Sequence, residues 1–337
     1  MAARERRRAA GDDEGFGQPP SADAAVPSDV FYTSSDGLRL HARAYGDPLS
    51  PWLPVVCLSG LTRSSRDFHQ LATHLAGHRH RPRRVIAFDY RGRGGSQWDP
   101  DPRNYNPVTE AGDVFAGMAA FAIDRAVIVG TSRGGIIGML MAVARPAVVA
   151  GLVLNDVGPT IEARGLARIK AYVGRTPVPE DWADAAQIQR RLHGAQFTEW
   201  TEDDWDNFAR LTYRDQGGQP VADYDPALAH ALDGVELDQP MPDLWDEFRA
   251  LRGIPVMSIR GANSDLLSEA TVNRMAAEHP DFTALTVADE GHSPLLSRSG
   301  LLNRISAFVT GVEGSGPAPE AVVPRDPPVF DLDTRTG

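Results

Sequence analysis

The chain has 337 residues, a length that fits two domains of about 150 residues or one large domain with an insertion. Hydrophobic residues make up 42% and charged residues 23% of the sequence, which excludes a largely disordered, collagen-like or coiled-coil protein. The net charge is −11 and the arginines are scattered, so we expect no nucleic-acid partner, because such binding depends on clustered basic residues.

The cysteine count and the hydropathy of the chain also indicate where in the cell to expect the protein. The single cysteine, Cys57, cannot form an internal disulfide bond, which argues against a secreted disulfide-rich scaffold and favours a small core residue. The sequence contains no apolar run of about 18 residues, so we expect neither a transmembrane helix nor a membrane partner. The arginines at positions 4–8 are not followed by the apolar stretch of a secretory signal peptide. A cytoplasmic location is therefore expected.

The two ends of the chain differ from its middle. Residues 1–27 and 311–337 are rich in proline, glycine and alanine and have little to bury, so we predict disordered tails. Between them, β-branched runs alternate with amphipathic helical patterns, which predicts an α/β fold whose mostly parallel sheet is flanked by helices. In chain order, the expected strands cover 30–33, 38–44, 54–58, 84–88, 126–130, 149–154, 254–259 and 282–287. The expected helices cover 68–75, 108–122, 134–145, 268–278 and 296–309.

One segment interrupts this alternation. Residues 158–250 show helical patterns without a clear strand and hold 18 acidic and nine basic residues, so most of the net charge lies there. We predict a helical cap at 158–250, inserted between the two parts of the core at 28–157 and 251–310. Four of the six tryptophans lie in this segment and should form its core, although one or two could line a pocket: Trp182, Trp200, Trp205 and Trp245.

A short glycine-flanked serine motif suggests a nucleophile. Positions 130–134 read Gly-Thr-Ser-Arg-Gly, a G-x-S-x-G pattern between a predicted strand and a predicted helix. In such a turn the serine backbone is strained, and a side chain two residues to either side would collide with the strand or the helix. The alternative is a glycine-rich helix start that merely packs tightly. We favour Ser132 as a nucleophile.

A serine hydroxyl needs a base within hydrogen-bond reach and a third group that orients the base. Of the nine histidines, only His292 follows the last predicted strand in a turn. Asp265 follows the strand at 254–259, which gives the chain order nucleophile, acid, base. All three lie just beyond the carboxyl ends of strands, where open α/β sheets bind ligands. Asp156, at the end of the strand at 149–154, is the alternative acid.

Several ordered motifs resemble one family. Positions 59–63 read SGLTR, 89–96 read DYRGRGGS, 155–159 read NDVGP, and Gly291 precedes His292. With the serine motif and Asp265, they make the chain similar to the α/β-hydrolase superfamily, in particular its cap-bearing bacterial serine hydrolases, over about 30–310. The resemblance implies Ser132 as nucleophile, His292 as general base and acid, and Asp265 as the group that holds the imidazole.

The same resemblance implies an oxyanion hole made of two backbone N–H groups. The matching positions are Leu61 and Arg133, the residue after the nucleophile. Many relatives have His-Gly where this chain has Ser59 and Gly60, so no role of that histidine carries over. The Arg133 side chain either pairs with a nearby carboxylate or binds an anionic group of the substrate.

These residues predict a serine hydrolase that cleaves a carboxylic ester, or a related acyl bond, of a small or medium molecule. The alternatives are a carbon–carbon bond hydrolase of ring-fission products, a lactonase, and a ligand-binding protein on the same fold. Epoxide hydrolases and dehalogenases of this fold need an aspartate where this chain has Ser132, which excludes them.

No cofactor or metal is expected. The loop at 91–96 superficially suggests a dinucleotide site, but Gln97 stands where the third glycine of that motif is required. No histidine, cysteine or carboxylate pair has convincing metal-ligand spacing. The expected partner is a small-molecule substrate, and the expected assembly is a monomer or homodimer.

Overall fold

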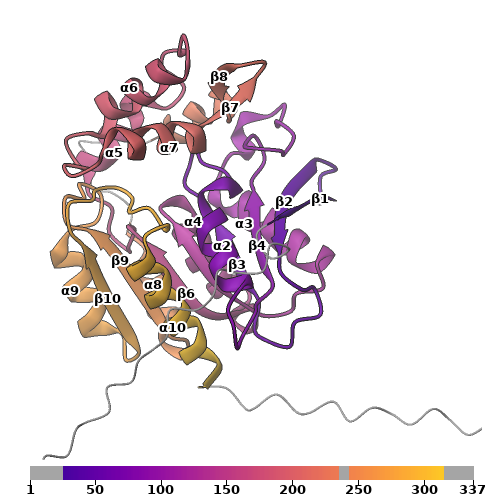
Figure 1. Ribbon diagram of the computed structural model, residues 1–337. Coiled ribbons are helices and arrows are strands. Elements are labelled where there is room, and N and C mark those ends of the chain that lie inside the picture. Colours follow the sequence, from indigo (N-terminus) through magenta and orange to yellow (C-terminus); the bar gives the residue numbers. More distant parts are fainter. Residues whose placement is uncertain (1–25, 235–242, 315–337) are drawn as a thin grey trace, which may run out of the picture.

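The computed structural model describes residues 26–234 and 243–314, so the predicted tails fall almost entirely outside the described residues. A central eight-stranded sheet lies between helices (Figure 1). Its order is β1-β2-β4-β3-β5-β6-β9-β10, and all neighbours except β1–β2 and β2–β4 pair in parallel. This confirms the predicted α/β fold. The strands are β1 (Ser28–Thr33), β2 (Arg39–Tyr45), β3 (Val55–Leu58), β4 (Val85–Asp89), β5 (Ala126–Thr131), β6 (Val149–Asn155), β9 (Val256–Gly261) and β10 (Phe282–Val287).

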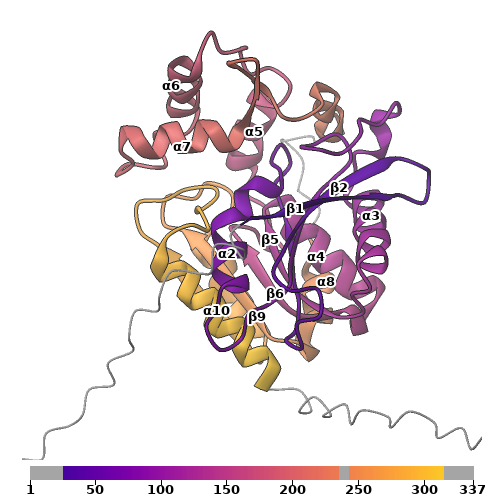
Figure 2. The same cartoon turned by 45° about the vertical axis from the view of Figure 1, so that its right-hand side comes forward.

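Helices cover both faces of the sheet (Figure 2). Because side chains alternate along a strand, Val56 and Leu58 of β3 pack on one face and Val55 and Cys57 on the other. Cys57 is fully buried, which confirms it as a core residue, and burial raises the pKa of its thiol. The first face is covered by α3 (Pro107–Ala120), α4 (Arg133–Ala144) and α8 (Trp245–Ala250), and the second by α2 (His69–Ala76) and α10 (Ser299–Gly314). The remaining helix of the main body, α9 (Glu269–Glu278), joins β9 to β10.

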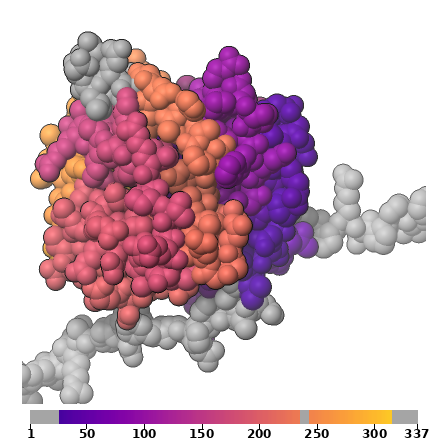
Figure 3. Space-filling view, turned by 90° about the horizontal axis from the view of Figure 1, so that it is seen from above, coloured from indigo at the N-terminus to yellow at the C-terminus, as the bar shows by residue number. Residues whose placement is uncertain are grey.

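Between β6 and β9 the chain leaves the main body. Residues 163–232, which we call the inserted segment, lie above the sheet (Figure 1) and cover much of the face seen from above (Figure 3). It consists of α5 (Ala163–Tyr172), α6 (Trp182–His193), α7 (Glu202–Thr212), the hairpin β7 (Tyr213–Gln216) and β8 (Gln219–Ala222), and the 3-10 helix η4 (Pro226–Leu232).

Two details of this region differ from the sequence-based expectation. The hairpin β7–β8 was missed because most of its side chains are exposed, so it lacks the apolar alternation of a half-buried strand. Trp245 lies on α8, whose side chains join the core of the main body, whereas Trp200 and Trp205 form a separate aromatic cluster in the inserted segment.

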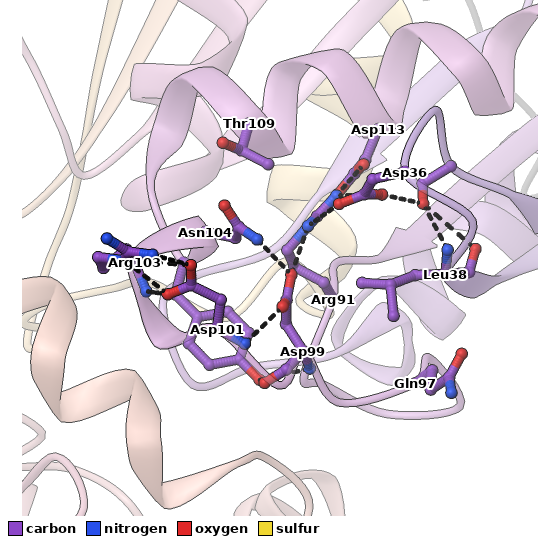
Figure 4. A network of polar contacts seen from close by, with 12 residues as sticks. Asp36, Leu38, Arg91, Gln97, Asp99, Asp101, Arg103, Asn104, Thr109 and Asp113 are labelled. Atoms are coloured by element: carbon purple, nitrogen blue, oxygen red, sulfur yellow. Dashed lines mark hydrogen bonds and ion pairs between the residues drawn. The ribbon is translucent and has the colours of Figure 1, made fainter.

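The loop after β4 is fixed by a buried ion network (Figure 4). Arg91 is 1% exposed and contacts the carboxylates of Asp36, Asp99 and Asp113 at 2.8, 2.5 and 2.6 Å. Burial alone would lower the pKa of Arg91, but its hydrogen bonds to Asp113 and Asp36 outweigh burial and raise the pKa. Arg91 therefore stabilises the conformation of this loop. Across the described ranges, none of the helices is long and apolar enough to cross a membrane.

Candidate active site

The turn that carries Ser132 joins β5 to α4. Ser132 has φ of 51°, in the left-handed region that side-chain-bearing residues rarely adopt. A Cβ added at Gly134 would lie 2.0 Å from the Leu58 carbonyl oxygen, and one at Gly130 would lie 2.4 Å from the Gly134 carbonyl carbon. The strand, sharp turn and helix predicted around Ser132 are therefore confirmed, and so is the steric need for both glycines.

Three side chains form a hydrogen-bonded chain that begins at this serine. His292 Nε2 lies 2.9 Å from Ser132 Oγ, and His292 Nδ1 lies 2.8 Å from Asp156 Oδ2. Asp156 is fully buried and also accepts hydrogen bonds from the Gly261 N–H at 2.8 Å and the Ser264 hydroxyl at 2.6 Å. Because an ionised carboxylate only accepts, it favours a proton on Nδ1 and leaves Nε2 free to accept the serine proton.

The expectation that Asp265 holds the imidazole is wrong. Asp265 instead accepts two hydrogen bonds from Arg168 of α5, at 2.8 and 2.9 Å. Burial alone would raise the pKa of Asp265, but the hydrogen bonds from Arg168 outweigh burial, so the pKa lies below its ordinary value. The carboxylate beside His292 belongs to Asp156, the alternative left open by the sequence.

The loop after β3 lies beside the serine. A Cβ added at Gly60 would lie 3.9 Å from the Ser132 Cβ, and Leu61 lines the same cavity as Ser132. Arg133 is the first residue of α4, where backbone N–H groups have no partner within the helix. The two residues predicted to supply an oxyanion hole thus lie on the two segments that meet at Ser132, and their role in catalysis stays a prediction.

The side chain of Arg133 points into a buried ion network. Its Nε lies 2.7 Å from the carboxylate of Glu110, which also pairs with Arg93 at 2.7 Å, and Arg93 donates to the Leu61 carbonyl oxygen at 2.8 Å. Burial alone would raise the pKa of Glu110, but the positive charges of Arg133 and Arg93 outweigh burial, so the pKa lies below its ordinary value. The carboxylate-pair alternative for Arg133 is confirmed. Sequence reasoning missed Arg93 and Glu110, because no spacing links the loop after β4 to the start of α3.

A cavity of about 340 Å³ lies between the inserted segment and the main body. Ser132 and His292 lie at its wall, and most of its area is apolar. Its charged pair, Arg63 and Asp67, is joined by hydrogen bonds at 2.6 and 2.8 Å. The four tryptophans of 158–250 do not line it, but Phe197, from the same aromatic cluster as Trp200 and Trp205, does. Within the described chain, no group of three or more histidine, cysteine or carboxylate side chains is arranged to hold a metal.

Comparison with known proteins agrees with this geometry. The model of the alpha/beta hydrolase family matches residues 55–305. The chain belongs to this family. A hydrolase of the family from Novosphingobium aromaticivorans is 38% identical, with a TM-score of 0.78 over 84% of this chain and 98% of its own. The 3-hydroxybutyrate-oligomer hydrolase of Cupriavidus necator is 33% identical over 303 residues, which cover 86% of this chain and 99% of that protein.

A second solved structure, a putative hydrolase from Rickettsia typhi, is 25% identical, with a TM-score of 0.74 over 85% of this chain and 99% of its own. The alpha/beta hydrolase resemblance inferred from the motifs is confirmed. The family match also runs from β3 into the first half of α10, so the inserted segment lies within the matched region.

Proposed function

We propose that this alpha/beta hydrolase is a serine esterase that cleaves carboxylic esters through an acyl-enzyme. The observation that carries the proposal is the continuous chain from the Ser132 hydroxyl through His292 to the buried carboxylate of Asp156. Asp156 holds the imidazole in the tautomer that accepts a proton and stabilises the imidazolium that forms. It takes the role that the family pattern suggested for Asp265.

In the first half of the reaction, His292 Nε2 accepts the hydroxyl proton while Ser132 Oγ attacks the ester carbonyl carbon. The backbone N–H groups of Leu61 and Arg133 bind the oxyanion of the tetrahedral intermediate. His292 then gives the proton to the leaving alcohol. In the second half, His292 deprotonates a water molecule, which attacks the acyl carbon. His292 then returns this proton to Ser132 Oγ as the bond between Oγ and the acyl carbon breaks, which releases the acid and the free serine.

We further propose that the natural substrates are esters of short hydroxy acids, such as 3-hydroxybutyrate oligomers. The similarity to the Cupriavidus necator hydrolase supports this, because it spans nearly all of that protein rather than one motif. The cavity is compatible with such a substrate. Its wall is mostly apolar, and its two charged side chains, Arg63 and Asp67, pair with each other.

The test of the nucleophile uses a fluorophosphonate probe, which reacts with activated serines. The wild-type protein should be labelled, Ser132→Ala should not, and Ser293→Ala should remain labelled although Ser293 also lines the cavity. Ester turnover should vanish with Ser132→Ala. Undiminished labelling of Ser132→Ala would overturn the assignment of the nucleophile.

A substrate panel tests the reaction class. It contains p-nitrophenyl esters of increasing acyl length, 3-hydroxybutyrate dimers and trimers, a lactone and an enol-ketone ring-fission product, each with Ser132→Ala as the blank. Hydrolysis of the esters and dimers supports the proposal. Turnover of the enol ketone alone contradicts it in favour of a carbon–carbon hydrolase. A folded protein that hydrolyses none of them but is stabilised by one is a ligand-binding protein.

A further inference from the structure

One histidine of the inserted segment lies in the cavity wall away from the serine. His193, the last residue of α6, is 8% exposed and lines the cavity. Its ring makes edge-on contacts with Tyr172 of α5 and Phe208 of α7, with ring centroids 5.6 and 5.8 Å apart and interplanar angles of 79° and 86°. Rings on two helices therefore fix the orientation of the imidazole.

The imidazole lacks the protein partner that buried polar groups normally have. His193 Nδ1 is buried and has no hydrogen-bond partner among the described residues. Two neighbouring polar side chains of the cavity wall do have partners. Gln189 Nε2 donates to the Tyr213 hydroxyl at 2.9 Å, and the Thr212 hydroxyl donates to the Phe208 carbonyl oxygen at 2.8 Å. Nδ1 is too buried for a bound molecule to reach. Nε2 also makes no hydrogen bond among the described residues but is not buried, so it is the ring nitrogen of this wall residue that a bound molecule can contact.

The charge state of His193 restricts which chemical group of a bound molecule it can hold. Burial, with the nearby positive charges of Arg168 and Arg63, lowers the pKa of His193 to about 3, so the ring is neutral at ordinary pH. A neutral imidazole has one nitrogen that donates and one that accepts. Both arginines already make two hydrogen bonds to a carboxylate, Arg168 to Asp265 and Arg63 to Asp67. The surroundings therefore favour an uncharged polar group over an anion.

We propose that His193 determines specificity by hydrogen bonding to a hydroxyl group on the acyl chain, so that hydroxyacyl esters react faster than unsubstituted acyl esters of the same length. This rests on the proposed esterase function and extends it to substrate choice. A hydroxyl fits the site because it is uncharged and can either donate or accept. Apolar wall residues such as Ile169 and Leu192 can contact the rest of the acyl chain but cannot recognise the hydroxyl.

The kinetic test compares aryl esters of 3-hydroxybutyrate and of butyrate. The wild-type enzyme should favour the hydroxy ester in kcat/KM by about 10- to 100-fold, because a site built to bind a hydroxyl discriminates against its absence. His193→Phe keeps an aromatic ring between Tyr172 and Phe208 but removes both nitrogens, and should bring this ratio close to one. His193→Gln, whose amide reaches the position of Nε2, should recover part of the preference.

A matched control separates this role from the loss of any buried histidine. His74 on α2 also has a buried ring nitrogen without a partner among the described residues, Nε2, but it does not line the cavity. His74→Phe should leave the ratio between the two esters at its wild-type value. A ratio that is unchanged in His193→Phe, or that falls equally in His74→Phe, overturns the proposal.

A binding experiment keeps the proposal independent of turnover. Calorimetry measures the affinity of Ser132→Ala for ethyl 3-hydroxybutyrate and for ethyl butyrate, and then of Ser132→Ala/His193→Phe for the same pair. If Ser132→Ala binds the hydroxy ester more tightly and the double variant does not, the role of His193 is supported. Failure of the wild-type enzyme to hydrolyse any ester would overturn only the esterase function and not this binding result. Equal affinity of Ser132→Ala for both esters overturns the role of His193, whether or not the double variant folds.

Discussion

Arg93 donates a hydrogen bond from Nε to the backbone carbonyl oxygen of Leu61, at a distance of 2.8 Å. Its guanidinium is fully buried and shares the carboxylate of Glu110 with Arg133. One ion network therefore holds both residues whose N–H groups we propose as the oxyanion hole. Because oxyanion donors act through preorganised geometry, Arg93 is a positioning residue for the loop after β3.

The first prediction concerns Arg93→Met. Loss of the bond to Leu61 should lower kcat by about 10- to 100-fold, less than the roughly 10²- to 10³-fold effect of removing an oxyanion donor, and leave KM nearly unchanged. Steady-state kinetics with a p-nitrophenyl ester measure both constants. Binding of a boronic acid that mimics the tetrahedral intermediate should weaken by a similar factor, while binding of the product acid stays the same. A merely destabilised enzyme would instead lose active-site titre with an unchanged kcat per titrated site.

The second prediction separates the two aspartates. Asp156→Asn should lower kcat by about 10³- to 10⁴-fold, because an amide cannot hold His292 in the required tautomer or stabilise the imidazolium. Asp265→Asn should keep kcat within about 10-fold of wild type and lower the free energy of unfolding by about 1–3 kcal/mol, because it weakens the pair with Arg168. Ester kinetics and urea unfolding of both variants measure these effects.

The matched variant Arg168→Met removes the same pair from the other side. It should destabilise the protein to a similar extent as Asp265→Asn and leave the pH dependence of kcat as it is in the wild type. A loss of activity in Asp265→Asn as large as that in Asp156→Asn would contradict the hydrogen-bonded chain through Asp156.

The sequence predicts Ser132 and His292 but not the choice between the aspartates, for a physical reason. Strands β6 and β9 are adjacent and parallel, so the residues that follow them emerge side by side. Both acids therefore come near the histidine loop. The choice depends on Arg168, which lies 97 positions from Asp265 in the chain and reaches it only once the inserted segment has folded over the sheet. No local pattern encodes such a contact.

Strand positions were predictable because the strands are apolar and short. The predicted strand at 282–287 coincides with β10, although none of its residues is fully buried, as expected for a strand at the sheet edge. Exposed polar elements were not predictable, as β7–β8 shows. The role proposed for His193 was not predictable either, because it depends on an imidazole without a hydrogen-bond partner in the cavity wall, which only the packed structure reveals.

The third prediction compares two glycines. Gly134→Ala should destabilise the fold by at least about 3 kcal/mol, because its Cβ would lie 2.0 Å from the backbone oxygen of Leu58. Gly112 lies inside α3, and a Cβ added there meets nothing within 4 Å, so Gly112→Ala should stabilise the protein by about 0.4–1 kcal/mol. Urea unfolding measures both. Equal effects of the two substitutions would contradict the steric account of the turn at Ser132.

The fourth prediction concerns the pH dependence of stability through His41. Burial lowers the pKa of His41, but Asp89 and Asp29, at 2.7 and 3.0 Å, outweigh burial and raise it above its ordinary value of 6.5. The folded protein therefore binds this proton more tightly than the unfolded chain does. The resulting stabilisation is complete below the unfolded pKa and is lost as the pH rises through the folded pKa. His41→Gln should thus cost more free energy of unfolding at about pH 5.5 than at about pH 9.

His69 provides a control of opposite sign. Burial and the nearby Arg43 lower the pKa of His69, so the unfolded chain binds this proton more tightly, and protonation at low pH destabilises the folded protein. His69→Gln removes that penalty, so this substitution should cost less free energy of unfolding at about pH 5.5 than at about pH 9. Urea unfolding of the wild-type protein and both variants at the two pH values measures the differences. If His41→Gln and His69→Gln change with pH in the same direction, the carboxylates of Asp29 and Asp89 do not stabilise the protonated form of His41.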